Sequence, residues 1–322
     1  MRTPPGTPPR IPWLARLLLL ALVGLGLASL AGALAPIGWP FELFVHFRTQ
    51  YGVAAAMLAA GLLLARRPAA AALAAVLAFA QFWSVVPRLQ ASETAARCDG
   101  DPFTVVIANL AFDNEDRQSL LAWIARHPAD LILLQELTPG WATAFQSLPD
   151  YPHRQQIART DPYGIAVLSR WPLHELTARD FAGDGLPLLV GYVDAGHTRL
   201  HVAAVHTHWP LLPELMRKRN LVLDRLAAEV RAGSGPAIVA GDFNLTPHSP
   251  AYRRLLDQSG LRETLPAGAW RPTWHAGFWP LALRIDHVLV SPGVCVESAA
   301  VGPEFGSDHR PVRVRLRLPV AG

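Results

Sequence analysis

The sequence predicts an α/β protein in two parts: an N-terminal bundle of about three transmembrane helices, and a four-layered α/β sandwich of two packed, mostly antiparallel sheets flanked by helices. Two observations carry this prediction. The hydrophobic fraction is 51% against 17% charged residues, and nearly all of the apolar excess lies before residue 90. Beyond residue 103, short apolar runs of strand length alternate with a few amphipathic stretches of helical period.

The first part, residues 1–90, has the composition of a membrane anchor. Its first apolar run is uncharged and reaches the roughly 20 residues that a helix needs to cross a bilayer. A signal peptide is the competing interpretation, because arginines precede this run. The run is longer than an ordinary signal sequence and more apolar sequence follows at once, which favours a retained helix. The expected helices lie near 17–37, 48–65 and 68–87.

The arginines also indicate an orientation. Arg2, Arg10 and Arg16 precede the first helix, and Arg66 and Arg67 separate the second helix from the third. By the positive-inside rule, three spans place everything after residue 88 on the external, periplasmic side of a bacterial inner (cell) membrane. The second run is short, and a count of two spans would place the same residues inside. Both topologies stay open, and a polar linker is expected over 91–102.

The second part, residues 103–322, is long enough to bury one core. Strand-like runs occur at 103–109, 131–135, 164–169, 188–193, 199–206, 236–240, 285–291 and 311–318, and helical stretches at 117–127, 213–231 and 251–260. Cys98 and Cys295 are the two cysteines. They could pair in an oxidising compartment, or they could be two unrelated buried thiols, and their spacing does not decide between these.

Net charge alone identifies no partner. The value is +4, and Lys218 is the single lysine among many arginines. Such a charge suits a phosphate-bearing substrate, but topology signals and genome composition explain it as well. A basic isoelectric point is therefore weak evidence for nucleic acid.

Polar side chains recur where the apolar strands end. The run 238–240 closes in Gly241, Asp242, Phe243 and Asn244, and alone such a sequence is typical of a turn. Acids and amides that close several strands would crowd one rim, where carboxylates repel each other unless a cation or protons neutralise them. Oxygen ligands with few thiols suit Mg²⁺ or Mn²⁺. Histidines at the same rim supply an acid or base near neutral pH.

Seven short motifs then follow one another in a recognisable order: VIANL, LLQEL, GIAVLSR, HTHW, GDFN, RIDHVLVS and GSDHRPV. This order resembles the endonuclease/exonuclease/phosphatase superfamily, which includes deoxyribonuclease I-like enzymes, neutral sphingomyelinases and inositol polyphosphate 5-phosphatases. The resemblance runs from about residue 103 to 318. Helices followed by such a domain also resemble a membrane-anchored bacterial branch.

The resemblance implies Mg²⁺- or Mn²⁺-dependent hydrolysis of a phosphoester by in-line attack of water. It implies that the metal is held at Glu136, Asn109 and Asp308, and that catalysis is carried by His208, Asp242, Asn244, Asp286 and His309. Asp286 would orient His309. Whether Asp242 or His309 is the general base stays open.

Three further residues are candidates for substrate binding: His206, Arg284 and Trp274. His206 stands where many members of the family have Asn. The resulting His-x-His could hold zinc, since residues i and i+2 of a strand share a face, but no third ligand is evident nearby. Trp274 belongs to a Trp-rich loop at 270–280, which could stack on bases, lie in a lipid interface, or cap the core.

The sequence therefore predicts a membrane-anchored phosphoesterase, with a phosphodiesterase or nuclease as the first hypothesis. The alternative is a lipid, inositol or sugar phosphate phosphatase, or a sphingomyelinase-like hydrolase. A non-catalytic membrane scaffold is the remaining reading, and the intact set of motif residues argues against it. The expected partners are a phosphate ester (nucleic acid, phospholipid or phosphorylated small molecule) and the bilayer, and no protein partner is evident.

Overall fold

The protein folds into two compact units, residues Met1–Val86 and Pro87–Gly322. The structure is a computed structural model, and it describes residues 12–85, 99–265 and 271–319. The two units are separate bodies of contacts and are treated in turn.

The N-terminal unit is helical. It contains α1 (Pro12–Ala33), α2 (Glu42–Val45), α3 (Arg48–Leu64) and α4 (Pro68–Val85). Leu22 of α1, Leu62 of α3 and Ala74 of α4 form its small buried core. Alanine at the contact lets helices approach closely, while many larger apolar side chains of α1, such as Leu20 and Leu27, face outward.

Helices occur at all three positions that the sequence indicated, but they differ in length and polarity. Among the described residues, one helix, Trp13–Ala33, is both long and apolar enough to cross a membrane. The helix α3 has 17 residues and begins with Arg48, and the apolar stretch of α4, Pro68–Trp83, is shorter than a span requires. The structure thus supports one candidate span, where the sequence had indicated about three.

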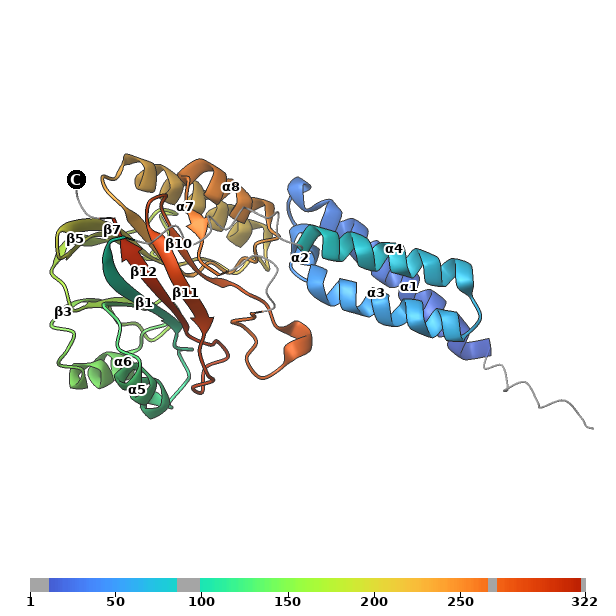
Figure 1. The fold of residues 1–322 in the computed structure, drawn as a ribbon, viewed down its shortest axis with the longest axis horizontal. Coiled ribbons are helices and arrows are strands. Elements are labelled where there is room, and N and C mark those ends of the chain that lie inside the picture. The colour runs from blue at the N-terminus through green and yellow to red at the C-terminus, as the bar shows by residue number, and fades with distance from the viewer. Residues whose placement is uncertain (1–11, 86–98, 266–270, 320–322) are drawn as a thin grey trace, which may run out of the picture. The chain divides into compact units, whose positions relative to one another are not determined.

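The C-terminal unit contains two six-stranded sheets (Figure 1). The first has the order β11-β12-β1-β2-β4-β3 and the second β5-β6-β7-β8-β10-β9. The pairs β1–β2 and β7–β8 are parallel and the other pairs are antiparallel. The bounds are β1 Asp101–Asn109, β2 Leu131–Gln135, β3 His153–Ile157, β4 Ile165–Ser169, β5 Leu173–Arg179, β6 Leu188–Ala195, β7 Thr198–His206, β8 Ala237–Asp242, β9 Arg262–Glu263, β10 Asp286–Val290, β11 Cys295–Val301 and β12 Val312–Leu318.

Helices complete four layers, as Figure 1 shows. The helices α5 (Arg117–Arg126) and α6 (Pro139–Ala144) cover the first sheet, and α7 (Pro213–Ala232) and α8 (Pro250–Ser259) cover the second. Between the sheets lies a core of buried aliphatic side chains, among them Val105, Leu133, Val202 and Val288. The α/β sandwich expected from the sequence is therefore present.

Every strand and helix expected in this unit is found, and several additional strands are present. The strands β3, β5 and β11 were not expected, because their side chains are polar or largely exposed and give no apolar run. Cys295 of β11 is disulfide-bonded. The other cysteine of the expected pair, Cys98, lies outside the described residues.

Strand pairing positions the polar strand ends. Asn109 at the end of β1 is in register with Gln135 at the end of β2. In the second sheet, Asp242 at the end of β8 is in register with both His206 of β7 and Asp286 of β10. Because these strand ends meet at one edge of the sandwich, residues far apart in the sequence are brought together there.

Candidate active site

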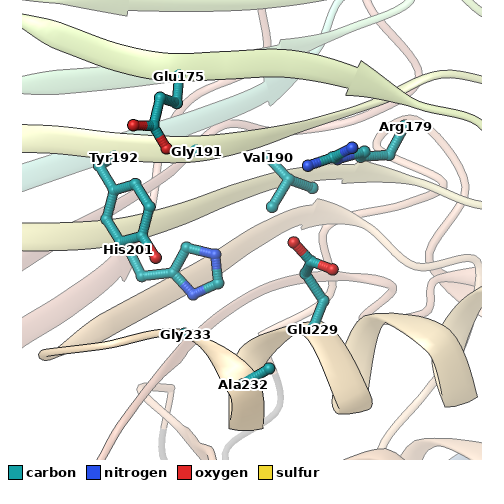
Figure 2. Close-up of a pocket in the computed structure, with 9 residues that line it drawn as sticks. All are labelled: Glu175, Arg179, Val190, Gly191, Tyr192, His201, Glu229, Ala232 and Gly233. Atoms are coloured by element: carbon teal, nitrogen blue, oxygen red, sulfur yellow. The ribbon is translucent and has the colours of Figure 1, made fainter.

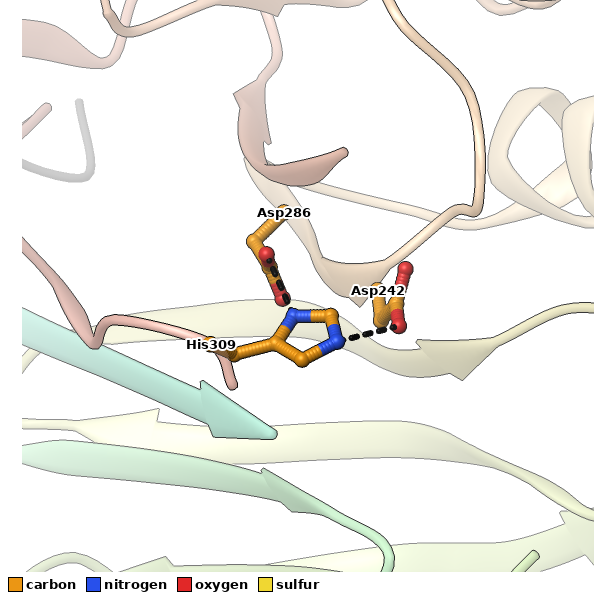
Figure 3. A group of neighbouring side chains, drawn as sticks. All are labelled: Asp242, Asp286 and His309. Carbon is orange, nitrogen blue, oxygen red and sulfur yellow. Dashed lines mark hydrogen bonds and ion pairs between the residues drawn. The ribbon is translucent and has the colours of Figure 1, made fainter. Parts of the chain in front are cut away.

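Asp242, Asp286 and His309 form a buried cluster at this edge (Figure 3). The ring of His309 lies between the two carboxylates, with Nδ1 2.9 Å from Asp286 Oδ2 and Nε2 3.8 Å from Asp242 Oδ2. An ionised carboxylate only accepts, so Asp286 fixes the proton on Nδ1 and leaves Nε2 to face the site.

The backbone around this pair is also fixed. The hydroxyl of Thr273 accepts hydrogen bonds from the amides of Ile285 and Asp286. The hydroxyl of Ser307 accepts from the amide of His309 and donates to the carbonyl of Asn109. These bonds tie the closing loop to β1 and hold the imidazole in place. Neither hydroxyl was singled out from the sequence, although Ser307 lies within the GSDHRPV motif.

Asn109 connects two acids. Its Nδ2 donates to Glu136 Oε1 and to Asp242 Oδ2, both at 3.0 Å, and its Oδ1 accepts from the amide of Ala111. The second oxygen of Glu136 accepts from the amide of Phe112. A continuous set of hydrogen bonds therefore runs from β2 through β1 to β8.

Unusual backbone conformations occur at the same place. Glu136 and Asn244 both have left-handed backbone angles, with φ of 58° and 50°. Gly241 has φ 142°, and a Cβ there would lie 2.0 Å from the carbonyl oxygen of Val205. Non-glycine residues in this region are costly and concentrate at functional sites. Here the conformation turns the Glu136 side chain back toward Asn109.

Burial and charge shift the pKa values of the site. Burial raises the pKa of Glu136, and hydrogen bonds from Asn109 and Phe112 offset only part of that rise. Burial and the charge of Asp286 raise the pKa of Asp242. Burial lowers the pKa of His309, but the charge and hydrogen bond of Asp286 raise it more, so the net shift is upward. Carboxylates held in this way are stabilised by any cation beside them.

The two histidines of the HTHW motif take different partners. His206 is buried beside Asp242, with Nε2 3.8 Å from Oδ2, and burial lowers the pKa of His206 to about 3. His208 Nε2 lies 2.7 Å from Asp184 Oδ2. Among the described residues, the group of acids and histidines close enough to share one ion is Asp242, Asp286 and His309, which contains neither His206 nor His208, so the geometry gives no support to a zinc site at this pair.

Sequence reasoning missed Asp184, Lys218 and Tyr163. Burial raises the pKa of Asp184, but hydrogen bonds from His208 and Lys218 lower it more, and Lys218 Nζ is 3.2 Å from its carboxylate. The ring of Tyr163 packs near both His206 and His208. Asp184 lies in a loop outside every motif, so no sequence signal pointed to it. As the single lysine, Lys218 was visible but had no identified partner.

The remaining predicted site residues lie around this centre. Asp308 is half exposed and accepts a hydrogen bond from Trp274 Nε1 at 2.8 Å. Asn244 donates from Nδ2 to the carbonyl of Thr207. Arg284 is half-buried and interacts electrostatically with Glu263.

His287, which follows Asp286 on β10, belongs to a separate cluster. Its Nδ1 lies 2.5 Å from Glu263 Oε2, its Nε2 lies 2.8 Å from the carbonyl oxygen of Leu245, and Tyr252 donates to the same carboxylate. Burial raises the pKa of Glu263, but the charge and hydrogen bond of His287 lower it more, to about 2. Every polar atom of this imidazole has a partner, as expected for a structural histidine.

The second sheet also has a recess of about 190 Å³ between β5, β6, β7 and the end of α7. Figure 2 shows Glu175, Arg179, His201 and Glu229 around it. It contains none of the predicted site residues, and its mixed charges select no ligand class. The candidate active site is therefore the strand-end cluster.

Comparisons with known proteins agree with the motif order. A model of the endonuclease/exonuclease/phosphatase family matches residues 106–309. The chain is 29% identical over 161 residues to a UPF0294 protein of Vibrio vulnificus (strain CMCP6), and 34% identical over 96 residues to one of strain YJ016. These alignments cover 48% and 29% of this chain, and 50% and 32% of those proteins.

Solved structures share the fold. An endonuclease/exonuclease/phosphatase from Bacteroides vulgatus matches with a TM-score of 0.58 at 20% identity, over 68% of this chain and 99% of that one. The 3' phosphatase NExo from Neisseria, bound to product DNA hairpin, matches at 0.53 and 21%, over 66% and 98%. D. rerio TDP2 complexed with single strand DNA product matches at 0.55 and 18%, over 67% and 99%. At these identities the likeness concerns the fold alone.

Proposed function

Because the chain belongs to the endonuclease/exonuclease/phosphatase family, we propose that it is a membrane-anchored, divalent-metal-dependent phosphoesterase that hydrolyses a phosphodiester by in-line attack of water. One observation carries the proposal. Glu136, Asn109 and Asp242 are joined by hydrogen bonds, and the Asp286–His309 pair lies beside them at the same edge. Such a buried set of acids, amide and imidazole is costly to maintain and concentrates at functional sites.

The Asp286–His309 pair supplies an oriented imidazole. With Nδ1 held by Asp286, Nε2 of His309 can exchange a proton with the attacking water or hydrogen-bond a phosphoryl oxygen. Asp242 Oδ1 accepts from the amide of Asn244, which orients the carboxylate to position and activate the same water. Asp242 and His309 therefore share the water-activating role in this proposal.

Asn244 and His208 act on the phosphate. The amide of Asn244 and the imidazole of His208 can donate to non-bridging oxygens or to the leaving oxygen, where negative charge develops. Asp184 accepts from His208 Nε2–H through an ionised carboxylate, so His208 can donate to a phosphoryl or leaving oxygen only as an imidazolium, through its second N–H at Nδ1. His206 is neutral and buried, and it packs beside Asp242 without adding charge.

The donor set fits a hard divalent cation. Glu136, Asn109 and Asp308 offer oxygen atoms, and the desolvated carboxylate of Glu136 has a raised pKa that a neighbouring cation would offset. When bound, Mg²⁺ or Mn²⁺ would polarise the phosphoryl group and offset its negative charge. Ligand atoms of Asp242, Asp286 and His309 also lie within 4.8 Å of one another, but in that group Asp286 already engages His309 through Nδ1. We therefore assign the metal to the Glu136 side.

The N-terminal unit is proposed to anchor the catalytic unit in a bacterial inner membrane. Support comes from the apolar helix Trp13–Ala33, and the proposed boundaries are 1–90 for the anchor, 91–102 for the linker and 103–322 for the catalytic domain. With an odd number of spans the catalytic domain faces the external, periplasmic side. A reporter phosphatase fused to the C-terminus should be active in that topology, and a well-expressed inactive fusion would contradict it.

The activity is tested with the full-length chain in detergent and bis-para-nitrophenyl phosphate as the diester. Mg²⁺ or Mn²⁺ should support hydrolysis, and EDTA should abolish it. Glu136→Ala and His309→Ala should each remove activity while the protein stays folded. Activity that survives both substitutions and EDTA would contradict the proposal.

A further inference from the structure

Large apolar side chains are exposed on three loops of the C-terminal unit. Among its described residues, eight large apolar residues are exposed: Phe112, Trp209, Leu211, Leu212, Leu221, Phe278, Trp279 and Leu281. All except Leu221 belong to three loops that follow or precede site residues. An apolar set of this size on a folded domain marks an interaction surface.

Each loop is attached to the active site. The amide of Phe112 donates to Glu136, so the first loop begins at the proposed metal ligand. Trp209 follows His208 directly. The third loop is joined to the closing motif, because Trp274 Nε1 and the amide of Ala276 both donate to Asp308.

The three loops are therefore attached to residues of the site, and we call their exposed large apolar side chains the apolar rim: Phe112, Trp209, Leu211, Leu212, Phe278, Trp279 and Leu281. The aromatic members are well exposed, with Trp209 at 55% and Trp279 at 64%. Figure 1 shows the segment that carries Trp279, in orange, projecting from the sheets. Loops of this kind can insert their tips without disturbing the sheet core.

We propose that the apolar rim docks on a lipid bilayer and that the active site takes its phosphodiester from that surface. The proposal rests on the phosphoesterase function proposed above and names its substrate class, a phospholipid headgroup ester. Tryptophan, phenylalanine and leucine are the side chains that partition into the interfacial layer of a bilayer. The same chain carries an apolar helix long enough to span a membrane.

A bilayer fits the rim better than nucleic acid does. Single-stranded nucleic acid requires a basic groove alongside its stacking aromatics. Near the rim, the charge of Lys218 is paired with Asp184 and Glu214, and Arg310 is paired with Glu304. The rim also contains three leucines, which bury well in acyl chains and do not stack on bases.

The test uses the full-length chain in vesicles of phosphatidylcholine and phosphatidylglycerol, with or without bromine on the acyl chains. Emission from Trp209 and Trp279 is isolated by subtracting the spectra of Trp209→Phe and Trp279→Phe, which keep an aromatic ring. Bromine quenches only tryptophan that reaches the acyl region. We expect Trp209 and Trp279 each to lose at least half of their fluorescence emission in brominated vesicles. Trp123, which is buried against the first sheet, provides the control through Trp123→Phe and should not be quenched.

An activity arm separates this inference from the proposed function. Trp209→Ser combined with Trp279→Ser should leave hydrolysis of bis-para-nitrophenyl phosphate within about twofold of wild type and lower hydrolysis of vesicle phospholipid at least tenfold. Leu221→Ser, on α7 outside the rim, should change neither. If the wild-type protein hydrolyses no diester at all, the proposed phosphoesterase function is contradicted. The quenching result still decides whether the apolar rim docks on the bilayer.

Three outcomes would overturn the docking proposal. The fluorescence of Trp209 and Trp279 could be unchanged by brominated lipid. They could be quenched by a single-stranded oligonucleotide and not by brominated lipid, which would assign the rim to nucleic acid. Or their emission could shift with protein concentration in unbrominated vesicles without lipid quenching, which would assign the rim to a second copy of the chain.

Discussion

Two histidines paired with acids differ in how completely they are bonded: His287 lies on β10 of the second sheet, and His309 lies in the loop before β12 of the first sheet. Asp286 and His287 are consecutive residues of β10, so their side chains point to opposite faces. On one face, His287 has partners for both ring nitrogens and lies between Glu263 and Leu245. On the other face, His309 is held by Asp286 through Nδ1, and its Nε2 lies 3.8 Å from the nearest carboxylate oxygens.

We propose that this difference separates a structural histidine, His287, from a catalytic one, His309. Both are nearly inaccessible to solvent and both face a carboxylate, so burial and acid pairing alone do not distinguish them. A ring with every nitrogen bonded stabilises the fold and has no nitrogen left for substrate. A ring oriented by one bond, with its other nitrogen at an edge rich in acids, is able to exchange a proton.

The largest effect is expected for His309→Ala. Diester hydrolysis should fall by about 10³-fold, as when one essential group of an acid–base pair is lost. Thermal stability should also fall, because the substitution leaves the Asp286 carboxylate buried without its imidazole partner, so the activity is compared per folded molecule. Steady-state kinetics and a thermal melt measure the two quantities. A His309→Ala variant that keeps a tenth or more of wild-type activity would contradict the catalytic role proposed for His309.

The matched substitution, His287→Ala, should act in the opposite way. It leaves the Glu263 carboxylate buried with Tyr252 as its remaining hydrogen-bond donor to that oxygen, which costs about 3 kcal/mol of unfolding free energy. The folded fraction should keep most of its activity. Chemical denaturation with activity measured below the transition tests both statements. Full stability combined with lost activity would assign His287 to catalysis.

The same cluster predicts a dependence of stability on pH. The pKa of Glu263 is lowered from 4.5 to about 2 in the folded state, so its contribution is complete above about pH 4.5 and is lost as the pH falls through 2. The contribution amounts to about 3 kcal/mol. Melting temperatures between pH 2 and 6, a range taken from that shift, should converge at low pH for wild type and Glu263→Gln. Parallel curves over this range would contradict the assignment.

A smaller effect is expected at the second acid–histidine pair. Asp184→Ala removes the acceptor that orients His208 Nε2, and activity should fall about tenfold, as for other groups that orient an active-site histidine. Asp184→Asn keeps an acceptor oxygen and should recover part of the loss. Glu214→Ala, which removes the exposed partner of Lys218, serves as the control and should leave diester hydrolysis unchanged.

The smallest effect is expected for Asp308→Asn. The side chain is 49% exposed, so solvent screens its charge and can replace its contacts. The apparent affinity for Mg²⁺ should fall only a few-fold, with kcat nearly unchanged. A loss of diester hydrolysis as large as that of His309→Ala would instead indicate that Asp308 is a principal metal ligand.

Much of the catalytic unit could be predicted from the sequence, because buried strands give apolar runs and motif residues close them. Asn109, Glu136, Asp242, Asp286 and His309 were predicted together, and the strand register explains why they meet. Asp184 could not be predicted, since its loop has no regular pattern and its partner His208 is 24 residues away.

The strands β3 and β11 were missed because exposed strands lack an apolar face. The N-terminal helices were predicted near their observed ranges, although α1 begins and ends before the expected 17–37, and among the described residues only α1 is long and apolar enough to cross a membrane. Hydropathy shows where a helix is apolar, whereas its ends depend on packing and capping. Exposed apolar side chains on the loops next to the site could not be predicted from the sequence, since exposure is a property of the folded chain.

The central prediction is that Glu136 holds a divalent cation that the reaction requires. Metal titration tests this prediction most directly. Mn²⁺ binding to the full-length protein can be followed by electron paramagnetic resonance, in parallel with diester hydrolysis. We expect Glu136→Gln to weaken Mn²⁺ binding at least tenfold and to abolish diester hydrolysis. We expect His309→Ala to abolish diester hydrolysis and to retain Mn²⁺ binding. Unchanged Mn²⁺ binding by Glu136→Gln, or lost binding by His309→Ala, would contradict it.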